Sequence, residues 1–291
     1  MKGIWRKKEA KRIDWADTVV CPYINKRGNM PYAKVNGIKI YYETYGEGHP
    51  LLLIGGLGSQ IQSWAVQVPI YSKHFHVIVF DNRGAGKSDK PDVPYTTEMM
   101  ADDASMLLDA LGIESAHIAG KSMGGMIGQW IAIKYPERVK RLVLGCTSAS
   151  RDGVGNEILG MGREIATKIG MKAVWLSAIF WGYTREYIEK NLSSIKQTLE
   201  TIPEDPDALT GYIRQSLACQ GHNTRDLVGQ IKAPTLVMLG ENDLSASPRL
   251  SRELADLIPG AELRVFHGVG HGFWRERQED VDRVVLDFLL S

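Results

Sequence analysis

Short apolar segments of strand length alternate with amphipathic segments of helix length through most of the chain. The apolar segments are residues 51–54, 77–80, 116–119, 142–144, 236–239 and 262–266. The helical segments are residues 97–111, 123–135, 249–257 and 280–290. Strands that alternate with helices form a mostly parallel sheet with helices on both faces. The sequence therefore predicts an α/β fold, in which ligands bind beyond the carboxyl ends of the strands.

Two departures from this alternation define the predicted domain organisation. Between Leu144 and Leu236 the residues are helical and aromatic in character, and no core strand is recognisable. Because structureless loops of that length are rare, we expect a helical cap inserted after the sixth strand. Near the start, residues 34–43 alternate around Asn36-Gly37, which predicts a β-hairpin. The predicted parts are a basic arm over residues 1–31, an α/β core over residues 32–146 and 231–291, and a helical cap over residues 147–230.

Charge and cysteine content limit the partners and the environment. The 291 residues include 35 Lys and Arg and 34 Asp and Glu, a balance that gives no global attraction to nucleic acid or anionic membranes. No apolar run approaches the ~20 residues that cross a bilayer, so we expect no membrane span. Cys21, Cys146 and Cys219 are too few and too widely spaced for a disulfide framework or a zinc site. We therefore expect reduced thiols, a cytoplasmic location and no metal.

The segment that carries the most chemical information is residues 117–125, which reads as a strand, a G-x-S-x-G pentapeptide and a helix. A serine in this pattern lies on a strained strand-to-helix turn, and the flanking glycines are needed because side chains there would clash. The turn exposes the serine hydroxyl, and the helix N-terminus favours developing negative charge. A chance pentapeptide is the alternative. The preceding strand and the glycine-rich helix favour Ser122 as a nucleophile.

A serine nucleophile needs a base, and the base needs a carboxylate that orients it. Asp243 and His271 each follow one of the last two predicted strands, and glycines surround the histidine. The order Ser, Asp, His along the chain is typical of this architecture. We therefore predict a triad of Ser122, Asp243 and His271. Glu241 is disfavoured as the acid because it lies close to its strand, and His267 as the base because it lacks the glycine-flanked approach.

The predicted chemistry also requires donors for the oxyanion that forms when a carbonyl is attacked. One donor is expected to be the backbone N–H of Met123, directly after the nucleophile. The other is expected from the Gly-Gly-Leu-Gly loop at residues 55–58, where Leu57 N–H is the candidate. An ordinary tight turn is the alternative interpretation of that loop.

Together these motifs resemble those of the α/β-hydrolase fold serine hydrolases. The resemblance extends from about residue 32 to the end, and residues 81–89 are similar to the turn that the family carries after its fourth strand. Within the family, the sequence is most similar in character to small bacterial carboxylesterases and enol-lactone hydrolases. The resemblance implies a serine esterase or lactonase that acts on a small molecule without a cofactor. The sequence departs from many relatives at Gly55, where they carry histidine.

Other activities fit the same triad. Carbon–carbon bond hydrolysis and perhydrolysis both occur in the family, and a ligand receptor that retains the triad is a rival of another class. Carbon–carbon hydrolases usually need a basic residue for the substrate carboxylate, and three arginines of the predicted cap are candidates: Arg151, Arg163 and Arg185. The aromatic residues of the cap fit either a buried helix face or an apolar pocket wall. They are Trp175, Ile179, Phe180, Tyr183 and Tyr187.

Overall fold

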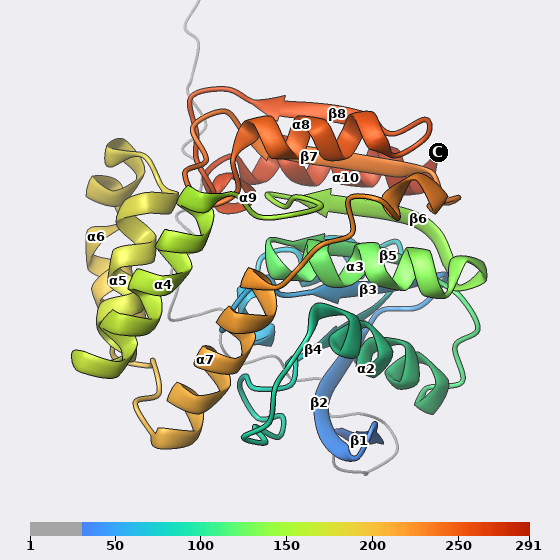
Figure 1. Cartoon of the computed structure of the whole chain (residues 1–291). Coiled ribbons are helices and arrows are strands. Elements are labelled where there is room, and N and C mark those ends of the chain that lie inside the picture. Colours follow the sequence, from blue (N-terminus) through green and yellow to red (C-terminus); the bar gives the residue numbers. More distant parts are fainter. Residues whose placement is uncertain (1–30) are drawn as a thin grey trace, which may run out of the picture.

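The computed structural model describes residues 31–291 and confirms the predicted α/β class (Figure 1). Eight strands form one sheet in the order β1-β2-β4-β3-β5-β6-β7-β8. The strands are β1 (Tyr32–Val35), β2 (Ile38–Tyr45), β3 (Pro50–Ile54), β4 (His76–Phe80), β5 (Ala116–Lys121), β6 (Val139–Gly145), β7 (Thr235–Gly240) and β8 (Glu262–Phe266). The pairs β1–β2 and β2–β4 are antiparallel, and the other neighbours are parallel. The carboxyl ends of all the parallel strands therefore lie at the same edge of the sheet.

The hairpin predicted around Asn36-Gly37 forms one edge of the sheet. Val35 pairs with Ile38, and the two residues between them have φ angles of 46° and 79°. A two-residue turn with both positions in the left-handed region matches the twist of the strands that it joins. The predicted basic arm over residues 1–31 lies, except for its last residue, outside the described part of the chain.

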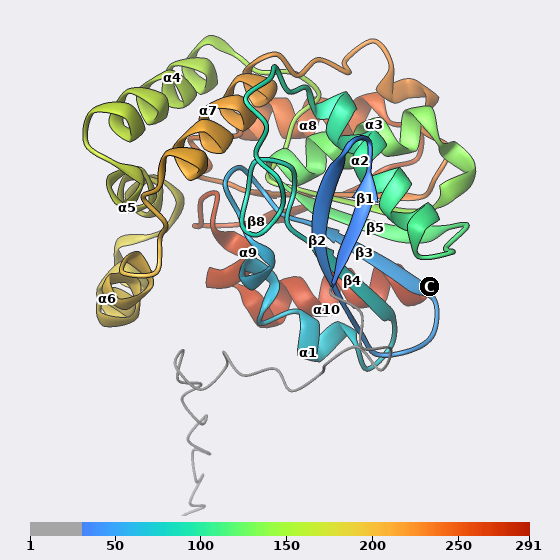
Figure 2. The ribbon, with the colours of Figure 1, turned by 90° about the horizontal axis from the view of Figure 1, so that it is seen from below.

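Helices cover both faces of the sheet, as the alternation predicts (Figures 1 and 2). One face carries α2 (Thr97–Ala110), α3 (Met123–Lys134) and α8 (Pro248–Leu257), and the other carries α1 (Val68–Tyr71), α9 (Phe273–Glu276) and α10 (Gln278–Leu290). Successive side chains of a strand point to opposite faces. Leu52 and Ile54 of β3 therefore join the first core, whereas Leu51 and Leu53 join the second.

Four α-helices lie between β6 and β7, which confirms the expectation of a helical cap after the sixth strand. They are α4 (Gly153–Lys168), α5 (Met171–Gly182), α6 (Arg185–Leu199) and α7 (Pro206–Gln220). In Figure 1 the arrowheads of β6 and β8 point towards α4, α5 and α6. The side chains of Asp152, Thr184 and Asp205 cap the N-termini of α4, α6 and α7. Within residues 31–291 no helix is both long and apolar enough to cross a membrane.

The last cap helix is also packed directly on the core. A Cβ atom added at Gly211 of α7 would overlap the carbonyl oxygen of Gly84, in the loop that follows β4. Only a glycine allows two backbones to approach this closely. Helix α7 therefore connects the cap to the loops at the carboxyl edge of the sheet.

A buried ion pair ties this part of the core together. Arg83 and Asp103 are 4% and 2% exposed, and Arg83 Nη2 donates to Asp103 Oδ1 at 2.6 Å while its Nε donates to Oδ2. Asn36 Nδ2 donates to the same carboxylate at 3.0 Å. The pair thus joins the loop after β4, helix α2 and the turn of the β-hairpin.

We expect Asp103→Asn to lower the free energy of unfolding by about 3 kcal/mol, because it leaves the Arg83 guanidinium buried without a counter-charge. Urea unfolding measures this loss. The matched control is Asp92→Asn, which breaks the exposed ion pair with Arg214 and should change stability by less than about 1 kcal/mol. Equal effects of the two substitutions would contradict the role given to the buried pair.

Candidate active site

Ser122 occupies a strained turn between β5 and α3. Its φ and ψ angles are 56° and −121°, and its N–H donates to the carbonyl oxygen of Gly145 at 2.8 Å. A Cβ atom at Gly120 would overlap the carbonyl oxygen of Gly124, and one at Gly124 would overlap that of Ile54. The two glycines of the pentapeptide therefore let the start of α3 pack against the ends of β3 and β5. The packing holds the serine at the carboxyl edge of the sheet.

Asp243 and His271 meet at the same edge. His271 Nδ1 lies 2.7 Å from Asp243 Oδ2, and the Asp243 side chain is fully buried while that of His271 is 24% exposed. The N–H groups of Ser245 and Ala246 donate to the other carboxylate oxygen, both at 2.8 Å. One oxygen is thus fixed by the backbone and the other is free to orient the imidazole. Within residues 31–291 no hydrogen bond joins Ser122 to His271.

The rival acid and base contact each other instead. His267 Nδ1 lies 3.2 Å from Glu241 Oε1, and Gly268 N–H donates to Glu241 Oε2 at 3.1 Å. Both side chains are exposed, at 75% for the histidine and 46% for the glutamate. This pair forms a surface contact at the β8 loop, separate from the Asp243–His271 pair.

The loop over residues 55–58 is held by side chains from two other segments. Asn82 Nδ2 donates to the Gly55 carbonyl at 3.2 Å, and the Gly58 N–H donates to Gln215 Oε1 at 2.7 Å. Gln215 lies in α7, is fully buried and donates through Nε2 to the Arg83 carbonyl at 2.6 Å. Sequence reasoning missed Gln215, because a lone glutamine 157 residues from its partner has no motif to mark it.

The predicted oxyanion donors lie in this loop and at the start of α3. In the described structure the N–H groups of Leu57 and Met123 donate to no protein acceptor. The departure at Gly55 also has a local explanation. A Cβ atom there would lie 3.1 Å from Ser59 Cβ and 3.6 Å from Ser63 Oγ, so these serines fill the space beside the backbone.

The cap contacts the loops that carry the predicted donors and the histidine. Trp175 Cζ2 lies 3.7 Å from the position that a Cβ atom would take at Gly58. Gly272, directly after the histidine, donates its N–H to the carbonyl oxygen of Gly182 at 2.7 Å. Close by, Thr184 N–H donates to Glu276 Oε2 at 3.2 Å. The end of α5 and the start of α6 are therefore attached to the loop that carries His271.

The aromatic residues of the cap do not all lie in the same environment, and the sequence allowed either a buried helix face or an apolar pocket wall. Tyr183 and Tyr187 are stacked with their ring centroids 4.8 Å apart, and Tyr183 packs over Gly272. Burial is the main reason why the pKa of Tyr183 is raised. Phe180, in contrast, is 59% exposed. Trp175 and Tyr183 thus face the predicted site, whereas Phe180 lies on the outer surface.

Lys121, the variable residue directly before the nucleophile, has an unusual environment. Its Nζ donates to the Ser63 carbonyl at 2.8 Å and lies 4.1 Å from the ring centroid of Trp64. Trp64 is buried in the short 3-10 helix η1 (Ile61–Trp64). Burial, with a smaller contribution from the Arg275 charge, lowers the pKa of Lys121 to about 7. The sequence analysis assigned no role to Lys121.

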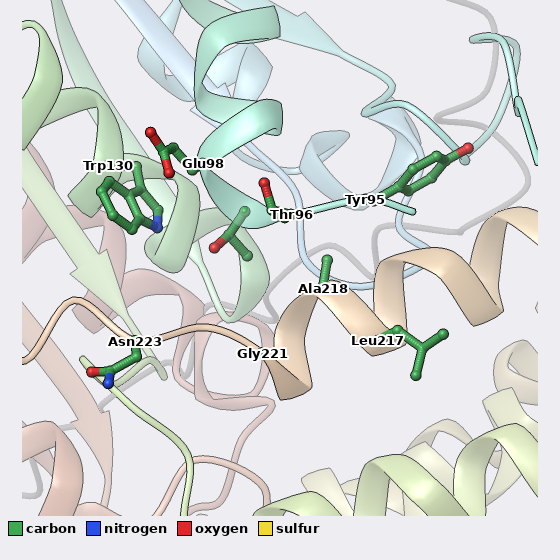
Figure 3. Close-up of a pocket in the computed structure, with 9 residues that line it drawn as sticks. Tyr95, Thr96, Glu98, Trp130, Leu217, Ala218, Gly221 and Asn223 are labelled. Atoms are coloured by element: carbon green, nitrogen blue, oxygen red, sulfur yellow. The ribbon is translucent and has the colours of Figure 1, made fainter. Parts of the chain in front are cut away.

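A hollow of about 180 Å³ opens between α2, α3 and the end of α7, and Figure 3 shows Trp130, Leu217 and Asn223 among its lining residues. None of the three predicted triad residues lines it. In the part of the chain that the structure describes, no group of three or more His, Cys, Asp or Glu side chains is arranged to hold a metal ion.

Comparisons with known proteins identify the fold family of the chain. The sequence model of the alpha/beta hydrolase fold family matches residues 49–274. A putative carbamate hydrolase RutD of Azorhizobium caulinodans is 29% identical over 262 residues, which cover 89% of this chain and 98% of that protein. The 2-hydroxy-6-oxononadienedioate/2-hydroxy-6-oxononatrienedioate hydrolase of Comamonas testosteroni is 28% identical over 294 residues, covering 92% and 95%. The crystal structure of the enol-lactonase from Burkholderia xenovorans LB400 is similar with a TM-score of 0.83 and 32% identity, covering 90% and 100%.

The lowered pKa of Lys121 predicts a pH-dependent stability. In the unfolded chain the lysine has its ordinary pKa of 10.5, so between pH 7 and 10.5 the unfolded state binds more protons than the folded state. The resulting destabilisation is complete below about pH 7 and disappears as the pH rises to 10.5. Lys121→Met should therefore raise the free energy of unfolding by about 1–3 kcal/mol at pH 6, and the gain should shrink towards pH 10.

Urea unfolding across this pH range tests that expectation. The matched control is Lys134→Met, because Lys134 has carboxylate partners in Asp102 at 2.6 Å and Glu98 at 3.0 Å, and they raise its pKa. Its removal should give no gain in stability at any of these pH values. A loss of stability in Lys121→Met at pH 6 would contradict the argument.

Proposed function

The chain belongs to the α/β-hydrolase fold family, and from that premise we propose that it hydrolyses a carboxylic ester or lactone through an acyl-enzyme on Ser122. The observation that carries the proposal is the 2.7 Å contact between a buried Asp243 and His271 at the sheet edge where Ser122 lies in its strained turn. A nucleophile, a base and an orienting acid at one edge form the arrangement that acyl transfer requires.

In the proposed mechanism, Ser122 Oγ attacks the substrate carbonyl while His271 Nε2 takes the hydroxyl proton. Asp243 accepts from Nδ1, which fixes the tautomer with Nε2 free and stabilises the imidazolium that forms. The N–H groups of Leu57 and Met123 donate to the oxyanion of the tetrahedral intermediate. Collapse of this intermediate breaks the bond to the alkoxide, which receives the proton from His271. Water then attacks the acyl-enzyme by the same sequence and releases the acid.

The relatives support a hydrolase and differ in the bond that they break. Their names specify an enol-lactone, a carbamate and a hydroxy-oxo dienedioate or trienedioate as the substrate. The comparison with the enol-lactonase favours an ester-type bond, since that protein is 32% identical and is covered completely. We therefore assign the ester or lactone class first, and cleavage of a carbamate or of a carbon–carbon bond becomes an outcome of the assay.

Ser122→Ala should reduce kcat for ester hydrolysis by about a thousandfold or more, because the substitution removes the nucleophile and leaves the elbow glycines in place. The assay follows p-nitrophenyl esters from acetate to laurate together with a simple lactone. The matched control is Ser193→Ala on the exposed side of α6, which should retain full activity. Full activity in Ser122→Ala would refute the assignment. Cleavage of a carbamate or a carbon–carbon bond alone would correct the substrate class.

Gln215→Leu should lower kcat about tenfold or more, with a smaller change in KM. The leucine cannot bridge the Gly58 N–H and the Arg83 carbonyl, so the loop that presents Leu57 N–H loses its support. Steady-state kinetics with a p-nitrophenyl ester measure the effect. Gln220→Leu on the same helix is the matched control, because Gln220 is exposed and accepts its hydrogen bond from Arg163, far from the loop at residues 55–58 in the sequence. Equal kinetics in the two variants would exclude a positioning role for Gln215.

A further inference from the structure

The corner of the cap between α5 and α6, residues 182–184, lies in direct contact with the loop that carries the predicted base. The N–H of Gly272 donates to the carbonyl oxygen of Gly182 at 2.7 Å. A Cβ atom at Gly270 would lie 2.9 Å from that same oxygen, and one at Gly272 would overlap the ring of Tyr183. The glycines on both sides of the histidine therefore let the cap corner reach the backbone of the loop.

The predicted base depends on this loop for its orientation. Within the described residues, the hydrogen bond of the His271 side chain is the one between Nδ1 and Asp243. The direction of Nε2 therefore also depends on how the backbone on either side of the histidine is held. Before the histidine, the carbonyl oxygen of Val269 accepts the N–H of Asn242 at 2.9 Å, which fixes the loop to the core. After the histidine, the bond from Gly272 fixes the loop to the cap corner.

A carboxylate on α9 holds the cap corner in place. Glu276 Oε2 accepts the N–H of Thr184 at 3.2 Å, and Glu276 Oε1 accepts the Thr184 hydroxyl. Helix α9 is a firm support for these bonds, because Phe273 and Trp274 are buried in the core. Helix α6, which begins directly after the corner, has no buried residue among its fifteen. The cap corner therefore depends on the bonds to Glu276 more than on the packing of α6.

We infer that Glu276 is a positioning residue for the predicted base. It acts through Thr184 and Gly182 on the loop, and so it makes the alignment of His271 depend on the placement of the cap. The inference rests on the proposed function, since this alignment matters only if the histidine takes a proton from the nucleophile. Misplacement by about 1 Å, caused far from the chemistry, can lower a rate about a hundredfold.

Steady-state kinetics of three variants test this role. Glu276→Ala should lower kcat for a p-nitrophenyl ester about tenfold or more and change KM less than about threefold, because the base is misaligned while the residues of the site remain. Glu276→Gln should retain most of the activity, since its amide can accept from the Thr184 N–H and donate to the hydroxyl oxygen. The matched control is Glu279→Ala, at an exposed position in the first turn of α10, which should behave like the wild type. Equal kcat values in Glu276→Ala and this control would overturn the inference.

The pH profile separates a positioning role from a direct effect of the carboxylate charge. The acidic limb of the kcat/KM profile reports the pKa of the base in the free enzyme. Because Glu276→Gln removes the charge and keeps the hydrogen bonds, its acidic limb should coincide with that of the wild type. A shifted limb would mean that the charge acts on the imidazole directly, which would overturn the positioning role.

Amide hydrogen exchange in the Ser122→Ala protein tests the contact without turnover. Adding Glu276→Ala should raise the exchange rate of the Gly272 N–H about tenfold or more, because the cap corner no longer holds its acceptor. The N–H of Ala246, which donates to Asp243 in the core, is the internal control and should exchange at an unchanged rate. Equal acceleration of both N–H groups would indicate a general loss of stability and would overturn a local role for Glu276.

The two kinds of measurement distinguish a failure of this inference from a failure of the proposed function. Faster exchange at Gly272 in Glu276→Ala, with no hydrolysis of any ester by the wild type, would refute the esterase and support the attachment of the loop to the cap. Ester hydrolysis that Glu276→Ala leaves unchanged, with unchanged exchange at Gly272, would support the esterase and refute the role of Glu276.

Discussion

The contact on which the rest of the site depends is the close approach of the start of α3 to the ends of β3 and β5. It exists because Gly120 and Gly124 have no side chains, and any Cβ atom at either position would overlap a carbonyl oxygen. The same contact forces Ser122 into the left-handed region and leaves the first N–H of the helix beside the loop at residues 55–58. Asp243 and His271 need no comparable strain, because parallel strands already deliver them to that edge.

Much of this arrangement follows from local sequence patterns. The hairpin at Asn36-Gly37 and the six core strands depend on residues close together in the chain. Asp243 and His271 are 28 residues apart, but each follows the end of a recognisable strand, and the two strands are parallel neighbours. The four-residue helices α1 and α9 were not predictable, because one turn shows no helical period. Gln215 was hidden for a different reason. Its two hydrogen bonds join segments that only the folded cap brings together. The buried environment of Lys121 likewise exists only after folding, so no sequence pattern marks it.

Two buried cations in this protein illustrate two uses of desolvated charge. The guanidinium of Arg83 is paired with Asp103 inside the fold, so its charge serves to join three segments. The ammonium of Lys121 lies against an aromatic ring and a carbonyl, so its charge opposes folding. Lys121 therefore lowers the stability of the fold at a position directly beside the candidate nucleophile.

The hydrogen bonds that attach the cap to the core limit how the substrate range of such a chain can change. Gln215 of α7 holds one side of the site, and Gly182 with Thr184 holds the loop of the histidine. The cap is therefore part of the framework of the site and is not an interchangeable module. A chimera that takes its cap from a relative inherits a working framework only if the donor helices supply equivalent bonds to Gly58, Gly272 and Glu276. Gradual substitution of side chains within the existing helices preserves those bonds, so it is the more accessible route to new specificity.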